Sequence, residues 1–496
     1  MAILALDAGT SSIRAMVFGD HGEILSRAQQ PFEQHFPRDG WVEHDAVEIW
    51  SVTIRCAQDA IHAAGISANA LAGIGIAVQR ETVVIWDRNT GQPIHRAIVW
   101  QDRRTAEECE RLASIPEAQE LVATTGLLLD PYFSATKIAW LLDNVSGARA
   151  AAEQGTLLAG TIDTWLLWKL TGGKTFATDA TNASRTLLFD ITKREWSSEL
   201  CTLFNVPMQM LAEVRDSASE FGTTTPDLFG SPIPIRAILG DQQAGALGQN
   251  CVAVGNAKVT YGTGCFALVN TGATPLVSKH RLLTTIAWQL DGVATYALEG
   301  SIFNAGTIVQ WMRDKLGFIA AAAESEAVAS SVESSSGVYC IPAFTGLGAP
   351  WWKPHARAAL VGMTRDTGRA EIVRAGLESV ALQTRDLMNA FADDGVVIDT
   401  LRVDGGMAEN NWLMQAVSDQ VQRPVERSAI IETTAWGAAR LAGLHAGLYP
   451  ELSEDSFRRV EQVFVPGNAA SANELHAGWL TALGRIVDEN PHDKQA

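Results

Sequence analysis

Residues 4–18 read LALDAGTSSIRAMVF, in which two apolar runs flank an acid, a glycine and three hydroxyl residues. The apolar runs are short and rich in strand-forming residues, so we expect two strands joined by a polar loop. Residues 257–270 read AKVTYGTGCFALVN and repeat this arrangement about half a chain later. The repeat predicts two related domains, each presenting a loop of glycine and hydroxyl residues to a shared cleft.

The residues around the first loop combine strand patterns with a helix pattern. Further runs of strand-forming residues lie at 23–30, 71–78 and 82–86. Asp45 is of the helix N-cap type, and apolar residues then recur on one helical face until Gly65. Strands in a meander, followed by a helix and more strands, are typical of a mixed sheet covered by helices. We therefore predict an α/β fold.

Length and composition set the number of domains. The chain has 496 residues, of which 47% are hydrophobic, so it can form two compact cores. In the second half, helix patterns lie at about 302–316 and 370–388, a short strand ends at Val403, and another helix begins near Asn410. We predict a first domain at 1–250 and a second at 251–496, divided within the small-residue stretch AGALGQNCVAVG.

Charge and cysteine content exclude several classes of protein. The net charge of −18 and the pI near 5.0 oppose binding to nucleic acid or to an anionic membrane. The six cysteines lie far apart with no C-x-x-C pair, which argues against a disulfide framework or a zinc site. The N-terminus has no basic leader, and no apolar run approaches the roughly 18 residues of a membrane helix. We expect a cytoplasmic protein with reduced thiols.

Two segments imitate nucleotide-binding motifs but lack the required context. TGGKT at 171–175 lacks the first glycine of a Walker loop, because Trp168 falls at that position. GTGCFA at 262–267 matches G-x-G-x-x-A, but a strand pattern follows it where a dinucleotide site needs a helix. We interpret the first segment as a helix end followed by a turn and the second as a turn between strands.

The first loop has the residues of a phosphate cradle. Gly9 lets the backbone approach an anion closely, and Arg14 adds a permanent positive charge. Hydroxyl and amide donors are available at Thr10, Ser11 and Ser12. The alternative interpretation is an ordinary polar hairpin turn, which is the commoner outcome for one such loop taken alone.

Two further loops strengthen the phosphate interpretation. Residues 262–264 offer a second glycine and threonine loop, and DGGMAEN at 404–410 offers a third ahead of a helix. Asp7 lies at a strand end, where its carboxylate could hold a cation. Three such loops after strands favour a nucleotide site over three unrelated turns.

A series of segments in fixed order resembles the FGGY carbohydrate kinases, of the actin and hexokinase superfamily. These segments are DAGTSSIR at 7–14, YFSATKIAWLL at 132–142, GDQQAGALG at 240–248, YGTGCF at 261–266 and LRVDGGMAENNWLMQ at 401–415. Within the family the chain is most similar to the members that phosphorylate glycerol, in the segments GWVEHD at 40–45, QRET at 79–82, AIVWQDRRT at 97–105, TNASRT at 181–186 and PAFTGLGAPWW at 342–352. The resemblance covers essentially the whole chain.

The resemblance implies two ribonuclease-H-like domains around a central cleft. The first domain would bind the polyol and carry the first phosphate loop, and the second would bind most of the ATP. The implied nucleotide-binding residues are Thr10, Ser11, Ser12, Arg14, Thr263, Gly306, Gln310, Gly406 and Asn410. Each has an alternative role: the glycines as turn formers, Gln310 as a helix surface residue and Asn410 as a helix cap.

The resemblance also implies a binding site for the acceptor. Its residues would be Arg80, Glu81, Trp100, Tyr132, Asp241, Gln242 and Phe266. Glycerol offers three hydroxyls and little apolar surface, so charged and amide groups walled by aromatic rings suit it. The alternatives are a surface ion pair for Arg80 with Glu81 and core packing for the rings.

The implied reaction is the ATP-dependent phosphorylation of glycerol to sn-glycerol 3-phosphate. Asp241 is the candidate general base, and Asp7 with Asp241 would hold Mg²⁺. Two alternatives stay open: a kinase for another short polyol such as erythritol, and a non-catalytic actin-like nucleotide-binding protein. The resemblance also implies self-association as a homodimer or homotetramer.

Overall fold

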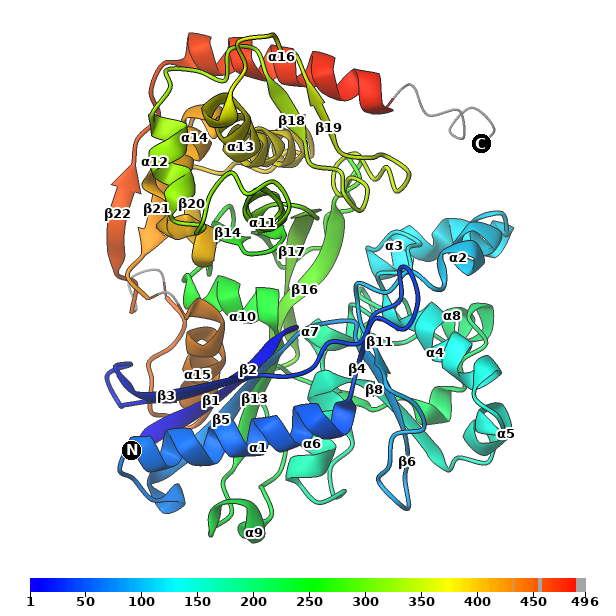
Figure 1. The fold of residues 1–496 in the computed structure, drawn as a ribbon. Helices are drawn as coiled ribbons and strands as arrows, with labels where there is room; N and C mark the ends of the chain where they lie inside the picture. The colour runs from blue at the N-terminus through cyan, green and yellow to red at the C-terminus, as the bar shows by residue number, and fades with distance from the viewer. Residues whose placement is uncertain (431, 454–456, 488–496) are drawn as a thin grey trace.

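The structure is a computed structural model and describes residues 1–430, 432–453 and 457–487 (Figure 1). The first sheet has five strands in the order β13-β5-β1-β2-β3. Their bounds are β1 (Ala2–Ala8), β2 (Ser12–Phe18), β3 (Ile24–Pro31), β5 (Leu71–Val78) and β13 (Ile235–Gly240). β1 and β2 form the predicted hairpin, while β5 and β13 continue the sheet in parallel with β1.

The second sheet repeats this beginning. It has seven strands in the order β16-β17-β15-β14-β20-β21-β22. Their bounds are β14 (Ala257–Tyr261), β15 (Cys265–Gly272), β16 (Leu283–Leu290), β17 (Val293–Ile302), β20 (Leu401–Asp404), β21 (Val425–Ser428) and β22 (Val460–Phe464). β14 pairs antiparallel with β15 and parallel with β20, as β1 does with β2 and β5. The predicted internal repeat is confirmed.

One face of the first sheet is covered by α1 (Ala46–Ala63). Its predicted cap is confirmed, because the Asp45 carboxylate accepts hydrogen bonds from the backbone amides of Val47 and Glu48. The buried residues Ile49, Val52 and others of this helix join the core beneath β1, β2 and β5. The helix therefore forms where its apolar face can be buried.

The other face of the first sheet is covered by two helices from different parts of the chain. These are α10 (Asp241–Gly248) and α15 (Thr433–His445), which lie between the two sheets in Figure 1. A Cβ atom at Gly75 of β5 would lie 2.2 Å from the Ala438 carbonyl oxygen, and one at Gly437 would lie 1.8 Å from that of Ala244. Only glycine allows these approaches, so the C-terminal half of the chain packs directly on the first sheet.

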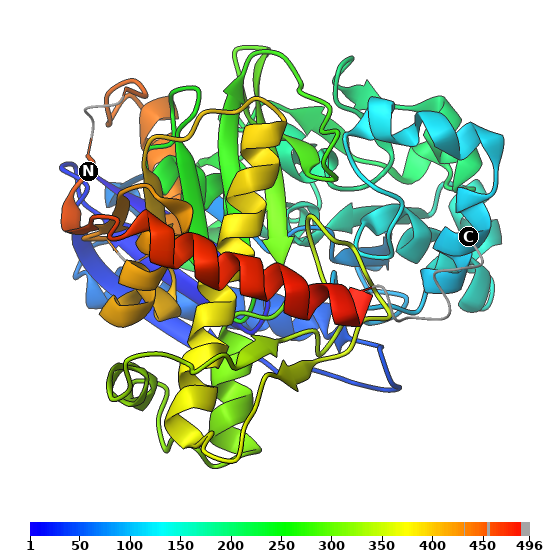
Figure 2. The same cartoon turned by 90° about the horizontal axis from the view of Figure 1, so that it is seen from above.

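Further helices of the C-terminal half lie around the second sheet. They are α11 (Gly306–Asp314), α12 (Glu324–Ser330), α13 (Arg369–Asp393), α14 (Asn411–Val421) and α16 (Ala469–Val487), with a small sheet of β18 (Tyr339–Ile341) and β19 (Ala359–Val361). Figure 2 shows α16 crossing α13, where His476 contacts Asp386 at 2.8 Å. The helix predicted at about 302–316 begins later than expected, because Ile302 is the last residue of β17 and α11 begins at Gly306.

A smaller lobe extends from the N-terminal half. Its four-stranded sheet has the order β4-β7-β6-β8, with β4 (Glu43–His44), β6 (Val83–Asp87), β7 (Ala97–Ile98) and β8 (Leu157–Thr161).

Further short elements of the N-terminal half are α2 (Ala106–Ala113), α3 (Leu121–Thr125), α4 (Ser134–Asn144), α5 (Ala148–Glu153), α6 (Ile162–Leu170), β9 (Ala177–Asp179), α7 (Ala180–Ala183), β10 (Phe189–Asp190), β11 (Glu195–Trp196), α8 (Ser198–Leu203), β12 (Glu213–Arg215) and α9 (Pro226–Phe229).

The two segments that imitate nucleotide-binding motifs have the local structure predicted for them. The TGGKT segment ends α6 and turns at Gly172 and Gly173, which both have positive φ. The GTGCFA segment leads into β15, a strand. All six cysteines are buried and free of disulfides. In the described ranges we find no helix with the length and apolar character that crossing a membrane requires.

Candidate active site

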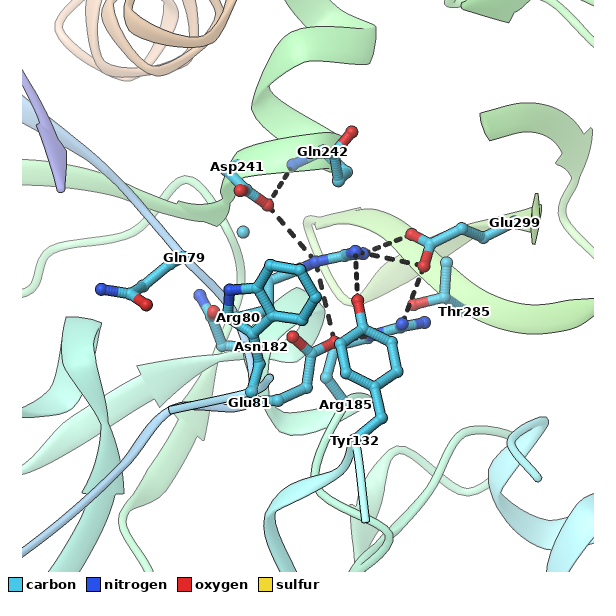
Figure 3. Close-up of polar contacts among 12 residues, drawn as sticks. Gln79, Arg80, Glu81, Tyr132, Asn182, Arg185, Asp241, Gln242, Thr285 and Glu299 are labelled. Atoms are coloured by element: carbon cyan, nitrogen blue, oxygen red, sulfur yellow. Dashed lines mark hydrogen bonds and ion pairs between the residues drawn. The ribbon is translucent and has the colours of Figure 1, made fainter. Parts of the chain in front are cut away.

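Arg80 is the centre of a buried polar cluster at the end of β5 (Figure 3). Its Nε lies 3.3 Å from Oδ1 of Asp241. Its Nη2 donates to Oε1 of Glu299 at 3.1 Å and to the Tyr132 hydroxyl at 3.3 Å. Only 2% of Arg80 is exposed, so the interpretation as a surface ion pair is wrong. The planar guanidinium instead contacts groups from three separate segments.

A second arginine and two glutamates complete this cluster. Arg185 donates from Nε to Glu81 at 2.7 Å and from Nη2 to Glu299 at 2.8 Å. Glu81 has a φ of 61°, which is uncommon for a residue other than glycine and typical of strained functional positions. Glu81 is the central residue of a tight turn that is closed by the Thr82 amide, which donates to the Arg80 carbonyl oxygen at 2.7 Å. This turn places Arg80 and Glu81 in the same cluster.

Asp241 is the first residue of α10 and follows β13 directly. Its Oδ1 accepts a hydrogen bond from the Gln242 amide at 2.7 Å, and 27% of its side chain is exposed. Burial raises the pKa of this carboxyl, while the nearby charges of Arg80 and Lys258 act in the opposite direction. The carboxylate thus contacts one cation and a backbone donor, and part of its surface stays open to solvent.

Gln242 does not join Asp241 in the Arg80 cluster. Its side-chain oxygen accepts a hydrogen bond from Lys258, whose Nζ also donates to Thr260 at 2.8 Å. Successive side chains on a helix point about 100° apart, so the two neighbours face different surroundings. The structure thus links the Gln242 side chain to the second sheet, and its predicted role as an acceptor ligand stays a prediction.

The three predicted aromatic residues do come together. The Trp100 ring lies edge-on to Tyr132, with centroids 5.5 Å apart, and to Phe266, with centroids 5.9 Å apart. These rings come from three distant segments, including β15 of the second sheet. Nε1 of Trp100 donates to the Thr10 hydroxyl at 3.0 Å, which connects this wall to the first phosphate loop. The aromatic wall and the polar cluster share Tyr132.

The first phosphate loop lies between β1 and β2. The Gly9 amide donates to the Ser12 carbonyl oxygen at 3.1 Å, and Ser11 at the tip is exposed. Arg14 lies 3.6 Å from Asp7 and donates to Glu432 at 2.9 Å. The predicted phosphate-binding residues Thr10, Ser11, Ser12 and Arg14 therefore belong to one short hairpin.

Asp7 and Asp241 are the two carboxylates that the sequence predicts to hold a cation. The pKa of Asp7 is raised to about 7, mainly by burial, with Arg14 opposing and Asp241 adding to the rise. Two carboxylates that repel one another in a buried place gain from a divalent cation between or beside them. Oxygen ligands of this kind suit Mg²⁺, so the donor set fits that ion.

The other predicted nucleotide-binding residues line one cavity of about 450 Å³ in the second half of the chain. They are Thr263, Gly306, Gln310, Gly406 and Asn410. The volume lies within the range of small-molecule sites. A Cβ atom at Gly306 would lie 2.6 Å from the Gly262 carbonyl oxygen, so this position needs glycine. Asn410 lines the cavity and also caps α14, because its Oδ1 accepts from the Leu413 amide at 2.9 Å.

Sequence reasoning missed three charged members of the site. Arg185 lies in the TNASRT segment, but no role was assigned to it. Glu299 is a fully buried acid in the apolar strand β17, and Lys258 is a buried base in β14. A charged residue inside an apolar strand needs a partner, and this signal could have marked both positions.

Both halves of the chain match one known protein family. Residues 2–248 match the N-terminal domain of the FGGY family of carbohydrate kinases, and residues 257–446 match its C-terminal domain. The chain belongs to the FGGY family of carbohydrate kinases. The resemblance inferred from the motif series is thereby confirmed, as is the α/β fold with its two family domains.

The similar proteins agree with this assignment. A glycerol kinase of Alcanivorax borkumensis is 56% identical over 487 residues, with 98% of each chain covered. A glycerol kinase of Bradyrhizobium sp. is 55% identical over 492 residues, also with 98% of each covered. The crystal structure of Plasmodium falciparum glycerol kinase with ADP is 36% identical, covers 98% of each chain and superposes with a TM-score of 0.90.

Proposed function

We propose that this enzyme transfers the terminal phosphoryl group of ATP to glycerol, giving sn-glycerol 3-phosphate. The observation that carries the proposal is the Asp241 carboxylate, held 3.3 Å from Arg80 within a polar cluster and beside an aromatic wall. Relatives that are 52–56% identical over at least 98% of this chain are glycerol kinases, which supports glycerol as the acceptor.

The chemistry of the cluster suits a small triol. Arg80 offers N–H donors, and Glu81 and Asp241 offer acceptors, so adjacent hydroxyls can be paired. The rings of Trp100, Tyr132 and Phe266 wall the carbon chain and exclude water. Water is a competing acceptor for the phosphoryl group, and excluding it prevents wasteful hydrolysis of ATP.

We assign Asp241 as the general base that accepts the proton of the glycerol hydroxyl. A glycerol hydroxyl oxygen forms a bond to the γ-phosphorus, the bond from that phosphorus to the bridging oxygen of ADP breaks, and the hydroxyl proton passes to the Asp241 carboxylate. A positioned base contributes about 10²- to 10⁴-fold to the rate. Burial raises the pKa of Asp241 and so brings it closer to the working pH, which improves the carboxylate as a base.

The remaining residues hold the nucleotide. Thr10, Ser11, Ser12 and Arg14 on the first hairpin, with Thr263, would donate to the terminal phosphates. The cavity lined by Gly306, Gln310, Gly406 and Asn410 would take the rest of ATP. Asp7 and Asp241 would hold Mg²⁺, which supplies charge neutralisation for the phosphates when bound.

We also propose that the two predicted domains bind different substrates. Residues 1–250 carry most of the acceptor site and the first phosphate loop, and residues 251–496 add Phe266 to the acceptor site and bind most of the nucleotide. A cytoplasmic location suits an enzyme that uses ATP and has six free cysteines. Self-association as a homodimer or homotetramer stays a prediction, and light scattering of the purified protein tests it.

The function is tested by measuring ADP release with glycerol present and absent. We expect ADP release to depend on glycerol and on Mg²⁺, and kcat/KM to be higher for glycerol than for erythritol and other four-carbon polyols. Equal values of kcat/KM for these polyols would contradict glycerol as the preferred acceptor. ATP binding without turnover on any polyol would favour the non-catalytic alternative.

A further inference from the structure

We propose that His44, together with Gln34 and Gln79, positions the first phosphate loop relative to the aromatic wall of the acceptor site. The inference rests on the proposed function, since it assigns these residues to the alignment of the two substrates. Their hydrogen bonds reach the backbone of the phosphate loop and, through Thr82, the Trp100 amide. They are therefore positioning residues.

Two glutamine side chains hold the backbone of the phosphate loop. Nε2 of Gln79 donates to the Gly9 carbonyl oxygen at 3.1 Å. Nε2 of Gln34 donates to the Thr10 carbonyl oxygen at 3.0 Å. Consecutive carbonyls of the loop are thus both fixed from outside it.

His44 joins these two glutamines. Its Nε2 lies 2.7 Å from Oε1 of Gln34, and its Nδ1 lies 3.4 Å from Nε2 of Gln79. A carbonyl oxygen can only accept, so Gly9 and Thr10 fix which end of each glutamine is the donor. It follows that His44 donates from Nε2 and accepts at Nδ1, as a neutral imidazole.

The surroundings of His44 agree with a neutral ring. The residue is fully buried, and Phe32 lies edge-on to it with ring centroids 4.9 Å apart. Burial lowers the pKa of His44 to about 3, and the neighbouring His35 acts in the same direction. The imidazole therefore serves as a fixed spacer between Gln34 and Gln79 under all ordinary conditions.

The same network reaches the acceptor site on its other side. The Thr82 hydroxyl donates to Oε1 of Gln79 at 3.0 Å and accepts from the Trp100 amide at 3.3 Å. The Trp100 ring then donates from Nε1 to the Thr10 hydroxyl at 3.0 Å. A closed ring of hydrogen bonds therefore links the phosphate loop to the aromatic wall through two routes.

This arrangement matters because phosphoryl transfer depends on alignment. A displacement of about 1 Å between reacting groups can cost about 100-fold in rate. Removing the hydrogen bonds of His44 to Gln34 and Gln79 would let the phosphate loop shift relative to the aromatic wall. The contacts that each substrate makes with its own site would stay in place. We therefore expect a loss in kcat rather than in either KM, and more ATP spent on water.

The experiment measures kcat, both KM values and the ADP released per glycerol phosphorylated in the full-length enzyme. In His44→Phe we expect kcat to fall about 10- to 100-fold, both KM values to change less than about 3-fold, and the ADP ratio to rise several-fold. His44→Gln keeps the donor toward Gln34, so it should recover part of kcat. Gln34→Ala removes one carbonyl contact at a half-buried position and should show the same pattern if His44→Phe does not fold.

His476→Phe is the matched control, because His476 is also buried and hydrogen-bonded but lies on α16. We expect its ADP ratio to equal that of the unchanged enzyme. The inference is overturned if the His44 and Gln34 variants keep the wild-type kcat, or if kcat falls with no change in the ADP ratio, as a loss of folded enzyme alone would produce. Failure of the unchanged enzyme to phosphorylate glycerol would instead overturn the proposed function.

Discussion

Arg80 and Glu299 form a buried ion pair that joins the turn after β5 to strand β17 of the other sheet, with Nη2 and Oε1 3.1 Å apart. Arg185 contacts the same carboxylate at 2.8 Å. One acid from the C-terminal half of the chain thus fixes two arginines of the N-terminal half. The acceptor site is therefore built by both halves and depends on how they pack.

Replacing Glu299 by Gln should weaken the acceptor site selectively. The neutral amide leaves two buried guanidinium groups short of one negative charge, and breaking such pairs costs about 3–5 kcal/mol. We expect Tm to fall and the KM for glycerol to rise at least about 10-fold, with ATP binding little changed. Steady-state kinetics with calorimetric measurement of ATP binding checks this.

Glu378→Gln provides the comparison for that variant. Glu378 is also buried and paired with an arginine, since it accepts from Nε of Arg374 at 2.8 Å, but it lies on α13. We expect this change to lower Tm without altering the KM for glycerol. An equal rise in KM for both variants would show that loss of stability, rather than loss of the Arg80 contact, explains the effect.

Replacing Gly306 by Ala should affect the nucleotide side alone. The added methyl group would lie 2.6 Å from the Gly262 carbonyl oxygen and 3.4 Å from the Thr263 Cα, so the second phosphate loop must move. We expect the KM for ATP to rise about 10-fold or more, since contacts to phosphate are charge-assisted and sensitive to geometry. The KM for glycerol serves as the internal reference, and a shift in that constant instead would place the cavity outside the nucleotide site.

Asp163 gives a prediction about stability and pH. It is fully buried, accepts from the hydroxyls of Thr161 and Thr178, and has its pKa raised from 3.8 to about 6, mainly by burial. Between these two values the folded protein keeps a proton that the unfolded chain releases. The stability that this proton provides is complete below pH 4 and is lost as the pH rises through about 6.

Asp163→Asn removes this dependence. Relative to the unchanged protein, the variant should gain on the order of 3 kcal/mol in the free energy of unfolding between pH 4 and pH 7. Melting curves of both proteins across this range measure the difference, and other titrating groups cancel in the comparison. Parallel curves of Tm against pH would refute the assignment.

Local patterns were sufficient for the elements that depend on nearby residues. The β1–β2 hairpin, the Asp45 cap and the Asn410 cap follow from strand propensity and capping chemistry within a few residues. The order of the motifs indicated that Arg80 and Asp241 would lie in one site. The structure places them 3.3 Å apart, although 161 positions separate them in the sequence.

Other features depend on contacts that no local pattern records. Glu299 lies 219 positions from Arg80 and 114 from Arg185, so β17 reads only as an apolar strand with one acid. The packing of α15 on β5 depends on glycine positions in two distant segments. The sequence predicts the neighbours Asp241 and Gln242 as two ligands of one acceptor site, but helix geometry points their side chains in different directions.

The most direct test of the account is Asp241→Asn, which keeps the shape of the side chain and removes its ability to accept a proton. Binding of ATP, measured by calorimetry, should stay within about 3-fold of wild type, while the rate of glycerol phosphorylation in a single turnover should fall by about 10²- to 10⁴-fold. A variant that binds ATP normally and transfers phosphate at the wild-type rate would contradict the assignment of Asp241 as the base.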